Sequence, residues 1–294
     1  MNQRGRILRD HEFSYENRPK VTPVSIGRFS VLREVTTEQM GSQALVYQAV
    51  DPVTGNKVAL KVLEDDMQSF SASIMASLMR DNDINDIVSE SNILSAIQHP
   101  NVVGILETGD DPARGPYIVM EWVDGGTLEQ LIYDQSVNDG TQLSLQKCVA
   151  ISIQLLEGLS VVHSHGVIHG DIKPSNVLID GDGVVKLADF GVARLNQLNY
   201  GGPFRGTQGY LAPEREDFNA IAELSKTVDL YSVGIVMLEM LEGKIPSGPD
   251  DLEALVSGIP KPLDGIVRKA TNHLSEDRYL SAQAMIEALR EFLD

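Results

Sequence analysis

The sequence predicts an α+β fold in which a strand-rich part is followed by a larger, mainly helical part. Short runs rich in β-branched and aromatic residues, separated by turn residues, occupy residues 29–124. From residue 125 to residue 294, apolar residues recur at helical spacing instead. A chain of 294 residues is long enough for one large domain or two lobes, with an ample hydrophobic core.

The first 28 residues differ from the rest. Residues 1–28 are polar, contain two prolines and show no periodicity. We therefore expect an N-terminal tail, which is either disordered or lies against the fold.

The strand-rich part contains five predicted strands and one main helix. Asp51-Pro52-Val53-Thr54-Gly55 is a turn that joins the second strand to the third. The main helix runs from about Ile84 to Ile97 and ends at the His99-Pro100-Asn101 segment, because proline cannot continue it. The predicted strands are Phe29 to Val35, Ala44 to Val50, Lys57 to Leu63, Val102 to Thr108 and Pro116 to Trp122.

An additional segment lies between the third strand and the main helix. Phe70, Ile74, Met75 and Leu78 form a stripe with helical spacing, which predicts a further short helix. This helix either packs against the core or forms a regulatory or dimer contact.

The helical part has clear apolar periodicity. The predicted helices are Leu143 to His165, Leu230 to Leu241, one short helix within Gly248 to Pro262, and an amphipathic helix from Ser281 to Leu293.

Composition excludes several classes of protein. With 24 Lys and Arg against 42 Asp and Glu, the formal net charge is −18. Such a chain repels phosphate backbones and anionic lipids, so we expect no nucleic-acid partner. No apolar run approaches the roughly 20 residues of a membrane span, and the first residues lack the apolar core of a signal peptide. We therefore expect no membrane span and a cytoplasmic chain, unless it is a piece of a longer membrane protein.

The chain has one cysteine, Cys148. A single cysteine excludes an internal disulfide framework and fits a reducing compartment. Because Cys148 lies in an apolar helical run, a buried thiol is favoured over a reactive one.

The candidate catalytic residues lie between Val167 and Gly191, in the stretch VIHGDIKPSNVLIDGDGVVKLADFG. Asp171, Lys173 and Asn176 precede a hairpin pattern with an Asp-Gly turn, and Asp189 follows it. A hairpin brings its two ends together, so we expect Asp189 to face the same space as Asp171 and Asn176. These residue types are the parts that a phosphoryl-transfer site needs.

This order of motifs resembles the catalytic and metal-binding loops of eukaryotic-like Ser/Thr protein kinases of the bacterial type. The resemblance covers roughly residues 29 to 292 and implies a two-lobed fold, with an antiparallel N-lobe containing one main helix and a larger helical C-lobe. It implies an N-lobe at residues 29–124 and a C-lobe at residues 125–294. It also implies that ATP and Mg²⁺ act at the site and that proteins are the substrates.

The resemblance assigns roles to the central residues. Asp171 accepts or orients the proton of the substrate hydroxyl, and Lys173 steadies the γ-phosphate. Asn176 and Asp189 hold magnesium, a hard cation that prefers oxygen ligands.

The resemblance also implies a nucleotide site between the lobes. Lys61 holds phosphates and pairs with Glu90. Only the middle glycine of the glycine-rich loop, Gly41, survives, which leaves phosphate binding by that loop weakened. Backbone groups of Glu121 and Val123 bond adenine. The remaining implied contacts to the nucleotide come from Val46, Ala59, Met120 and Leu178.

The segment from Asp189 to Glu214 resembles an activation segment. The usual His-Arg-Asp reads His169-Gly170-Asp171, so the arginine that grips a phosphorylated segment is missing. Between Gly191 and Thr207 the only hydroxyl side chain is Tyr200. We therefore expect activity without phosphorylation of this segment.

Three further residues have structural roles by the same resemblance. Asp229 braces the catalytic loop, and Glu214 forms a buried ion pair with Arg278.

Two other functions stay open. A pseudokinase that binds nucleotide as a scaffold would explain the depleted glycine loop, but the intact Lys61, Asp171, Asn176 and Asp189 argue against it. A kinase-like fold acting on small molecules is disfavoured by the intact Ala212-Pro213-Glu214 segment.

Overall fold

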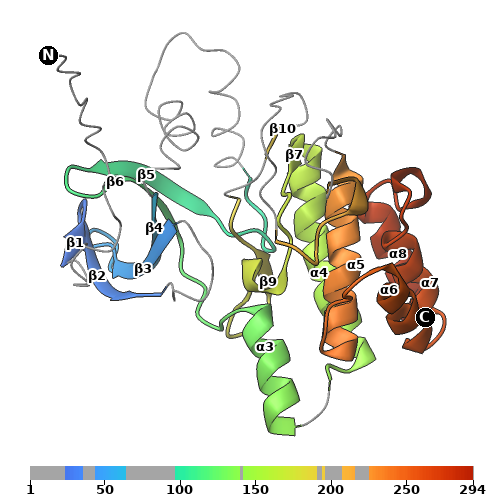
Figure 1. Ribbon diagram of the computed structural model, residues 1–294. Coiled ribbons are helices and arrows are strands. Elements are labelled where there is room, and N and C mark those ends of the chain that lie inside the picture. The colour runs from blue at the N-terminus through green and yellow to red at the C-terminus, as the bar shows by residue number, and fades with distance from the viewer. Residues whose placement is uncertain are drawn as a thin grey trace, which may run out of the picture.

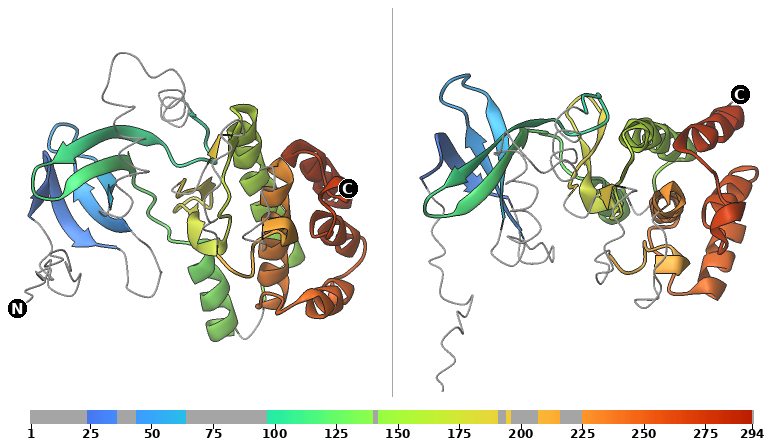
Figure 2. Two further views of the ribbon diagram at one scale, coloured as in Figure 1. Left: turned by 45° about the horizontal axis from the view of Figure 1, so that its top comes forward. Right: turned by 90° about the horizontal axis from the view of Figure 1, so that it is seen from above.

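The computed structural model describes residues 24–35, 44–63, 97–139, 142–190, 194–195, 207–215 and 225–293. One six-stranded sheet lies on one side of the molecule, and the helices gather on the other side together with two short two-stranded sheets (Figure 1). The two views of Figure 2 show the same division. The predicted α+β class and the two-lobed arrangement are confirmed.

The N-lobe is an antiparallel sheet with the strand order β1-β2-β3-β4-β6-β5. Strand β4 alternates, because Val58, Leu60 and Val62 lie in the apolar core of this lobe while Ala59 and Lys61 point to the opposite face. The strands are β1 (Ser25–Ile26), β2 (Phe29–Glu34), β3 (Ala44–Val50), β4 (Lys57–Leu63), β5 (Ile105–Asp111) and β6 (Gly115–Glu121).

Two strand boundaries differ from the prediction. Ser25 and Ile26 pair with β2, and Ile26 is fully buried, so folded structure begins before residue 29. Strand β5 begins at Ile105 rather than Val102, because Val102 and Val103 turn to Leu187 instead. The Val103 N–H donates to the Leu187 carbonyl at 2.9 Å.

Six α-helices are described. The helix expected from Leu143 begins at Leu145, because Ser144 accepts the N–H of Lys147 as its N-cap. The helix expected from Leu230 begins at Lys226, since Ser225 caps it. The helices are α3 (Leu128–Asp134), α4 (Leu145–Ser164), α5 (Lys226–Glu242), α6 (Pro249–Gly258), α7 (Leu263–Ala270) and α8 (Ala282–Leu293).

The C-lobe core surrounds α5, which packs between α4 and α7, while α8 covers α4. Residues 227–238 of α5 are buried without interruption, as expected for a helix that is apolar all round. Helix α4 is the one helix in the described ranges that is long and apolar enough to cross a membrane, and half of its apolar window is buried inside the fold. Cys148 on α4 is fully buried, as predicted, and this burial raises the pKa of its thiol to about 12.

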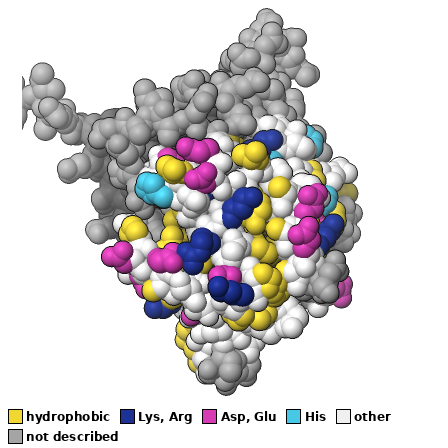
Figure 3. All heavy atoms as spheres, turned by 90° about the vertical axis from the view of Figure 1, so that its right-hand side faces the viewer, with side chains coloured by type: hydrophobic (Ala, Val, Ile, Leu, Met, Phe, Trp, Pro, Cys, Tyr) yellow, Lys and Arg dark blue, Asp and Glu magenta, His cyan; other side chains and the backbone are white. Residues whose placement is uncertain are grey.

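The outer face of the C-lobe carries basic, acidic and apolar side chains intermixed (Figure 3). Exposed pairs such as Arg268 with Glu253 belong to α7 and α6. The excess of acidic residues therefore does not make this face uniformly negative. The main helix predicted before His99 and the stripe from Phe70 to Leu78 lie outside the described residues.

Candidate active site

The predicted hairpin between Asn176 and Asp189 is confirmed. Strand β8 (Val177–Ile179) pairs with β9 (Val185–Leu187), and the Asp180 carboxylate accepts the N–H groups of Asp182 and Val184 to close the turn. Beyond the strands, the Ala188 N–H donates to the Asn176 carbonyl at 2.9 Å. The hairpin therefore places Asn176 directly beside the segment that carries Asp189.

Asp171 lies at the centre of a closed polar cluster. Its Oδ1 accepts the N–H of Thr207 at 3.0 Å and the Thr207 hydroxyl at 2.9 Å. Its Oδ2 lies 3.1 Å from Lys173 Nζ, and Lys173 Nζ also donates to the Thr207 hydroxyl oxygen at 2.6 Å. The Asp171 side chain is 13 % exposed, so it is held in one orientation but stays accessible from the site.

Thr207 lies within the predicted activation segment, Asp189 to Glu214, and its contact with Asp171 was not predicted. It lies 36 positions after Asp171. The preceding Gly206 and the following Ala212-Pro213-Glu214 were the available signals for its importance.

Asn176 presents an oxygen to the site. Its Nδ2 donates to the Asp171 carbonyl at 2.8 Å and to Asp171 Oδ2 at 3.2 Å, which fixes the orientation of the amide. Among the described residues no protein donor reaches Asn176 Oδ1. This oxygen is therefore suited to a hard cation.

Asp189 is the other predicted metal ligand, and its backbone has a φ of 62°. Non-glycine residues adopt this left-handed region at a cost, and such residues concentrate at functional sites. The described residues contain no group of three or more His, Cys, Asp or Glu that could hold a metal alone. One carboxylate and one amide oxygen fit Mg²⁺, which takes few protein ligands and completes its shell with water and phosphate.

Lys61 forms an ion pair with Asp189 Oδ1. The Lys61 side chain is 11 % exposed, so its charge is largely shielded from bulk water. Its predicted partner Glu90 and the predicted loop residue Gly41 lie outside the described residues.

The register of the sheet puts the predicted nucleotide residues on one face. Val46 pairs with Lys61, and Met120 pairs with Ala59. Directly opposed residues of antiparallel strands share a face, so all four side chains line the same side of the sheet. Leu178 of β8 is joined to the segment after β6 by a bridge to Thr127.

The segment after β6 carries the predicted adenine contacts. The Glu121 N–H donates to the Gly104 carbonyl at 3.0 Å, so it is already used. Within the described ranges, the Val123 N–H has no partner and stays available.

A buried carboxylate braces the catalytic loop, as predicted. Asp229 is fully buried and accepts the N–H of His169 at 3.0 Å, the N–H of Gly170 at 2.8 Å and a bond from His163 Nε2 at 2.8 Å. Burial by itself raises the pKa of Asp229, but these donors and the nearby histidines lower it below its ordinary value. The His169 ring packs on Phe190 at 5.0 Å between centroids, which links this loop to the segment after Asp189.

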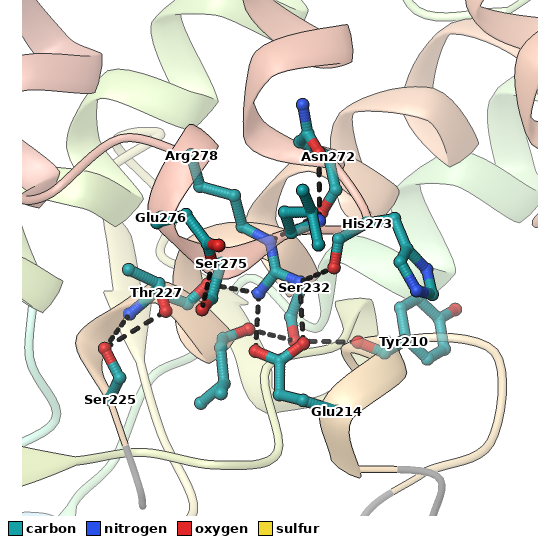
Figure 4. Close-up of polar contacts among 12 residues, drawn as sticks. Tyr210, Glu214, Ser225, Thr227, Ser232, Asn272, His273, Ser275, Glu276 and Arg278 are labelled. Carbon is teal, nitrogen blue, oxygen red and sulfur yellow. Dashed lines mark hydrogen bonds and ion pairs between the residues drawn. The ribbon is translucent and has the colours of Figure 1, made fainter.

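The predicted ion pair between Glu214 and Arg278 is confirmed (Figure 4). Two guanidinium nitrogens donate to the carboxylate at 2.7 and 2.6 Å, and Arg278 is 2 % exposed. Nearby, the Ser232 hydroxyl of α5 donates to the Tyr210 carbonyl at 2.8 Å. These contacts attach residues 207–215 to the rest of the C-lobe. They therefore help to fix the position from which Thr207 bonds Asp171.

Comparisons with known proteins agree with this geometry. A family model described as "Protein kinase domain" matches residues 38–293. The chain is 32% identical over 279 residues to the "Probable serine/threonine-protein kinase PknB" of Lactococcus lactis, covering 88% of this chain and 41% of that protein. It is also 32% identical over 275 residues to the "Serine/threonine-protein kinase PknL" of Mycobacterium tuberculosis, covering 86% of this chain and 64% of that protein. The chain thus spans less than two thirds of the length of these relatives.

Proposed function

This chain belongs to the protein kinase family, and we propose that it transfers the γ-phosphate of ATP to Ser and Thr hydroxyls of protein substrates. The observation that carries the proposal is the closed cluster of Asp171, Lys173, Asn176 and Thr207. It holds one carboxylate toward the space where a hydroxyl would be phosphorylated. The names of the curated relatives support the same reaction.

We assign different roles to the residues of the cluster. Asp171 orients the substrate hydroxyl and accepts its proton, because its carboxylate is fixed yet reachable. Lys173 bonds both Asp171 and Thr207, so its cation is positioned to offset negative charge that develops on the transferred group. Phosphoryl transfer depends mainly on such positioning and charge neutralisation.

The chain contains residues that are suited to bind the nucleotide and the metal. ATP is the substrate that supplies the phosphoryl group, and a bound Mg²⁺ would neutralise its phosphate charge. Asn176 Oδ1 and the Asp189 carboxylate are the oxygen donors for the metal. Lys61, which forms an ion pair with Asp189, would bind the phosphates of the nucleotide.

We propose further that activity does not require phosphorylation of the activation segment. Gly170 replaces the phosphate-gripping arginine and has a φ of 77°, a conformation that glycine adopts without strain. The two ends of the segment are held by other contacts. Strand β10 (Arg194–Leu195) pairs with β7 (Val167–Ile168), and Thr207 bonds Asp171. Mass spectrometry of active protein tests this, and obligatory phosphate on Tyr200 or Thr207 would overturn it.

The protein substrates and a cytoplasmic location are part of the proposal. A reaction that consumes ATP requires a compartment that supplies it. The single buried cysteine, Cys148, suits a reducing one.

Transfer of labelled phosphate from ATP with Mg²⁺ to the chain itself and to a generic basic protein tests the reaction. Asp171→Asn removes the carboxylate charge and keeps the size, and we expect transfer to fall at least about 100-fold. Asp250→Asn, an exposed acid on α6, is the matched control and should transfer like the wild type. If the wild type binds ATP but transfers nothing, the pseudokinase alternative replaces this proposal.

A further inference from the structure

The segment after β6 connects the two lobes, and an ion pair holds it in place. None of the proposed catalytic residues belongs to this ion pair. Glu121 is the last residue of β6, and its Oε1 accepts two bonds. One comes from the Gly104 N–H at 2.8 Å and the other from Lys186 Nζ at 3.0 Å. We call Glu121, Lys186 and Gly104 the hinge clasp.

The hinge clasp joins three segments that are distant in sequence. Gly104 precedes β5, Glu121 ends β6, and Lys186 lies in the middle of β9. Since the Glu121 N–H also donates to the Gly104 carbonyl, both the backbone and the side chain of Glu121 are tied to Gly104. The contact between Glu121 and Lys186 spans 65 positions and connects the N-lobe sheet to the β8–β9 hairpin.

Further bonds continue this attachment along the link. The Gly181 N–H donates to the Asp124 carboxylate at 3.2 Å, and the Ile179 N–H donates to the Gly126 carbonyl at 2.9 Å. A Cβ on Gly125 would lie 2.2 Å from the Ile179 carbonyl oxygen, which shows how closely the link approaches the hairpin. The backbone that presents Glu121 and Val123 is therefore braced on the hairpin.

The hinge clasp lies beside the nucleotide residues. Lys186 is the cross-strand partner of Leu178, so both side chains share one face of the hairpin. The Lys186 side chain is 15% exposed and that of Glu121 is 33% exposed, so the pair is partly shielded from water. Without Lys186, the Glu121 carboxylate would stand uncompensated near the site of an anionic nucleotide.

We propose that Glu121 and Lys186 are positioning residues that set nucleotide affinity. The ion pair holds the adenine-binding backbone of residues 121–123 against the hairpin and neutralises the Glu121 charge. We assign the ion pair no part in the transfer step, since among the described residues no polar contact joins it to the cluster around Asp171. The inference rests on the proposed kinase function, but it concerns binding and can be measured without turnover.

Titration of the full chain with a fluorescent ADP analogue tests the proposal. We expect Lys186→Met to raise the Kd about fivefold, as for loss of one partly shielded ion pair. Under phosphate-transfer conditions, KM for ATP should rise by a similar factor while kcat stays within about twofold of the wild type. The matched control Lys244→Met, which breaks the exposed pair of Lys244 with Asp251, should leave the Kd unchanged.

A second variant separates charge from folding. Glu121→Gln keeps an acceptor for the Gly104 N–H and removes the charge, so we expect a smaller rise in Kd. When Lys186→Met is combined with Glu121→Gln, the Kd should rise little further, because the two side chains contribute through one shared ion pair. A Kd for folded Lys186→Met equal to that of the wild type, or a fall in kcat at unchanged Kd, overturns the proposal. A wild type that binds the analogue but transfers no phosphate overturns the proposed function instead.

Discussion

Asp229→Asn is the substitution whose effect can be worked out most fully. The carboxylate of Asp229 accepts bonds from His169 N and His163 Nε2 at Oδ2 and from Gly170 N at Oδ1. An asparagine amide can accept at only one of these positions, and its NH₂ group then faces a donor at the other. A charged acceptor is lost and one or more buried N–H groups become unpaired.

The expected loss follows from these contacts. A hydrogen bond to a charged group contributes about 1.5–3 kcal/mol, and an unpaired buried donor costs about 1–3 kcal/mol. We expect the free energy of unfolding to fall by about 3 kcal/mol, which lowers the Tm by roughly 6–12 °C for a chain of this size. Because the affected N–H groups belong to the catalytic loop, phosphate transfer should also decrease.

The pH dependence provides a second readout. The folded-state pKa of Asp229 lies below its unfolded value. Its stabilising contribution is therefore complete above the unfolded pKa of about 4 and is lost as the pH falls through the folded-state pKa. The difference in stability between wild type and Asp229→Asn should be largest near neutral pH and should shrink below about pH 4.

Urea unfolding followed by circular dichroism from neutral to acidic pH measures these quantities, with Asp250→Asn as the exposed control. An Asp229→Asn variant as stable as the control, or a difference that stays constant down to pH 3, would refute the reasoning.

Two further substitutions have clear expected outcomes. Thr207→Val removes the hydroxyl that bonds Asp171 and Lys173, so kcat should fall about tenfold or more with little change in KM for ATP, and Thr207→Ser should restore activity. Steady-state kinetics check this, and a Thr207→Val variant with normal kcat would contradict it. Gly125→Ala places a Cβ 2.2 Å from a backbone oxygen, so we expect a lower Tm by calorimetry and weaker nucleotide binding. Gly248→Ala should behave like the wild type, because its Cβ would meet no described atom within 4 Å beyond its chain neighbours. Equal Tm values for the two variants would argue against the close approach at Gly125.

Local signals in the sequence accounted for much of the fold. The Asp180 to Gly183 turn predicted the β8–β9 hairpin, and apolar periodicity predicted α4, α5 and α8. Helix α3 was missed, although Thr127 and Gln130 form a capping box that marks its start. Helix α7 was missed because it is only eight residues long and contains a glycine. Strand β1 was missed because two residues carry no periodicity.

For the candidate site, the sequence predicted residues but not all of the contacts between them. Motif order predicted Asp171, Lys173, Asn176 and Asp189 as site residues. The structure joins the first three by polar contacts, and Asp189 lies just after the hairpin that follows Asn176. Thr207 was not assigned to Asp171, and the pairing of Lys61 with Asp189 was not predicted. Each of these contacts joins segments that are far apart in sequence, so no local pattern could reveal it.

By itself, the sequence determined which chemical groups the site contains and the local elements that carry them. Turn residues, caps and apolar spacing act over a few positions, so they can be recognised without knowing the fold. Only the tertiary structure decided that Asp229 receives three donors, that Thr207 closes on Asp171 and that Lys186 meets Glu121. These pairings depend on how the lobes, the hairpin and α5 pack, and packing is set by the whole chain rather than by any one segment.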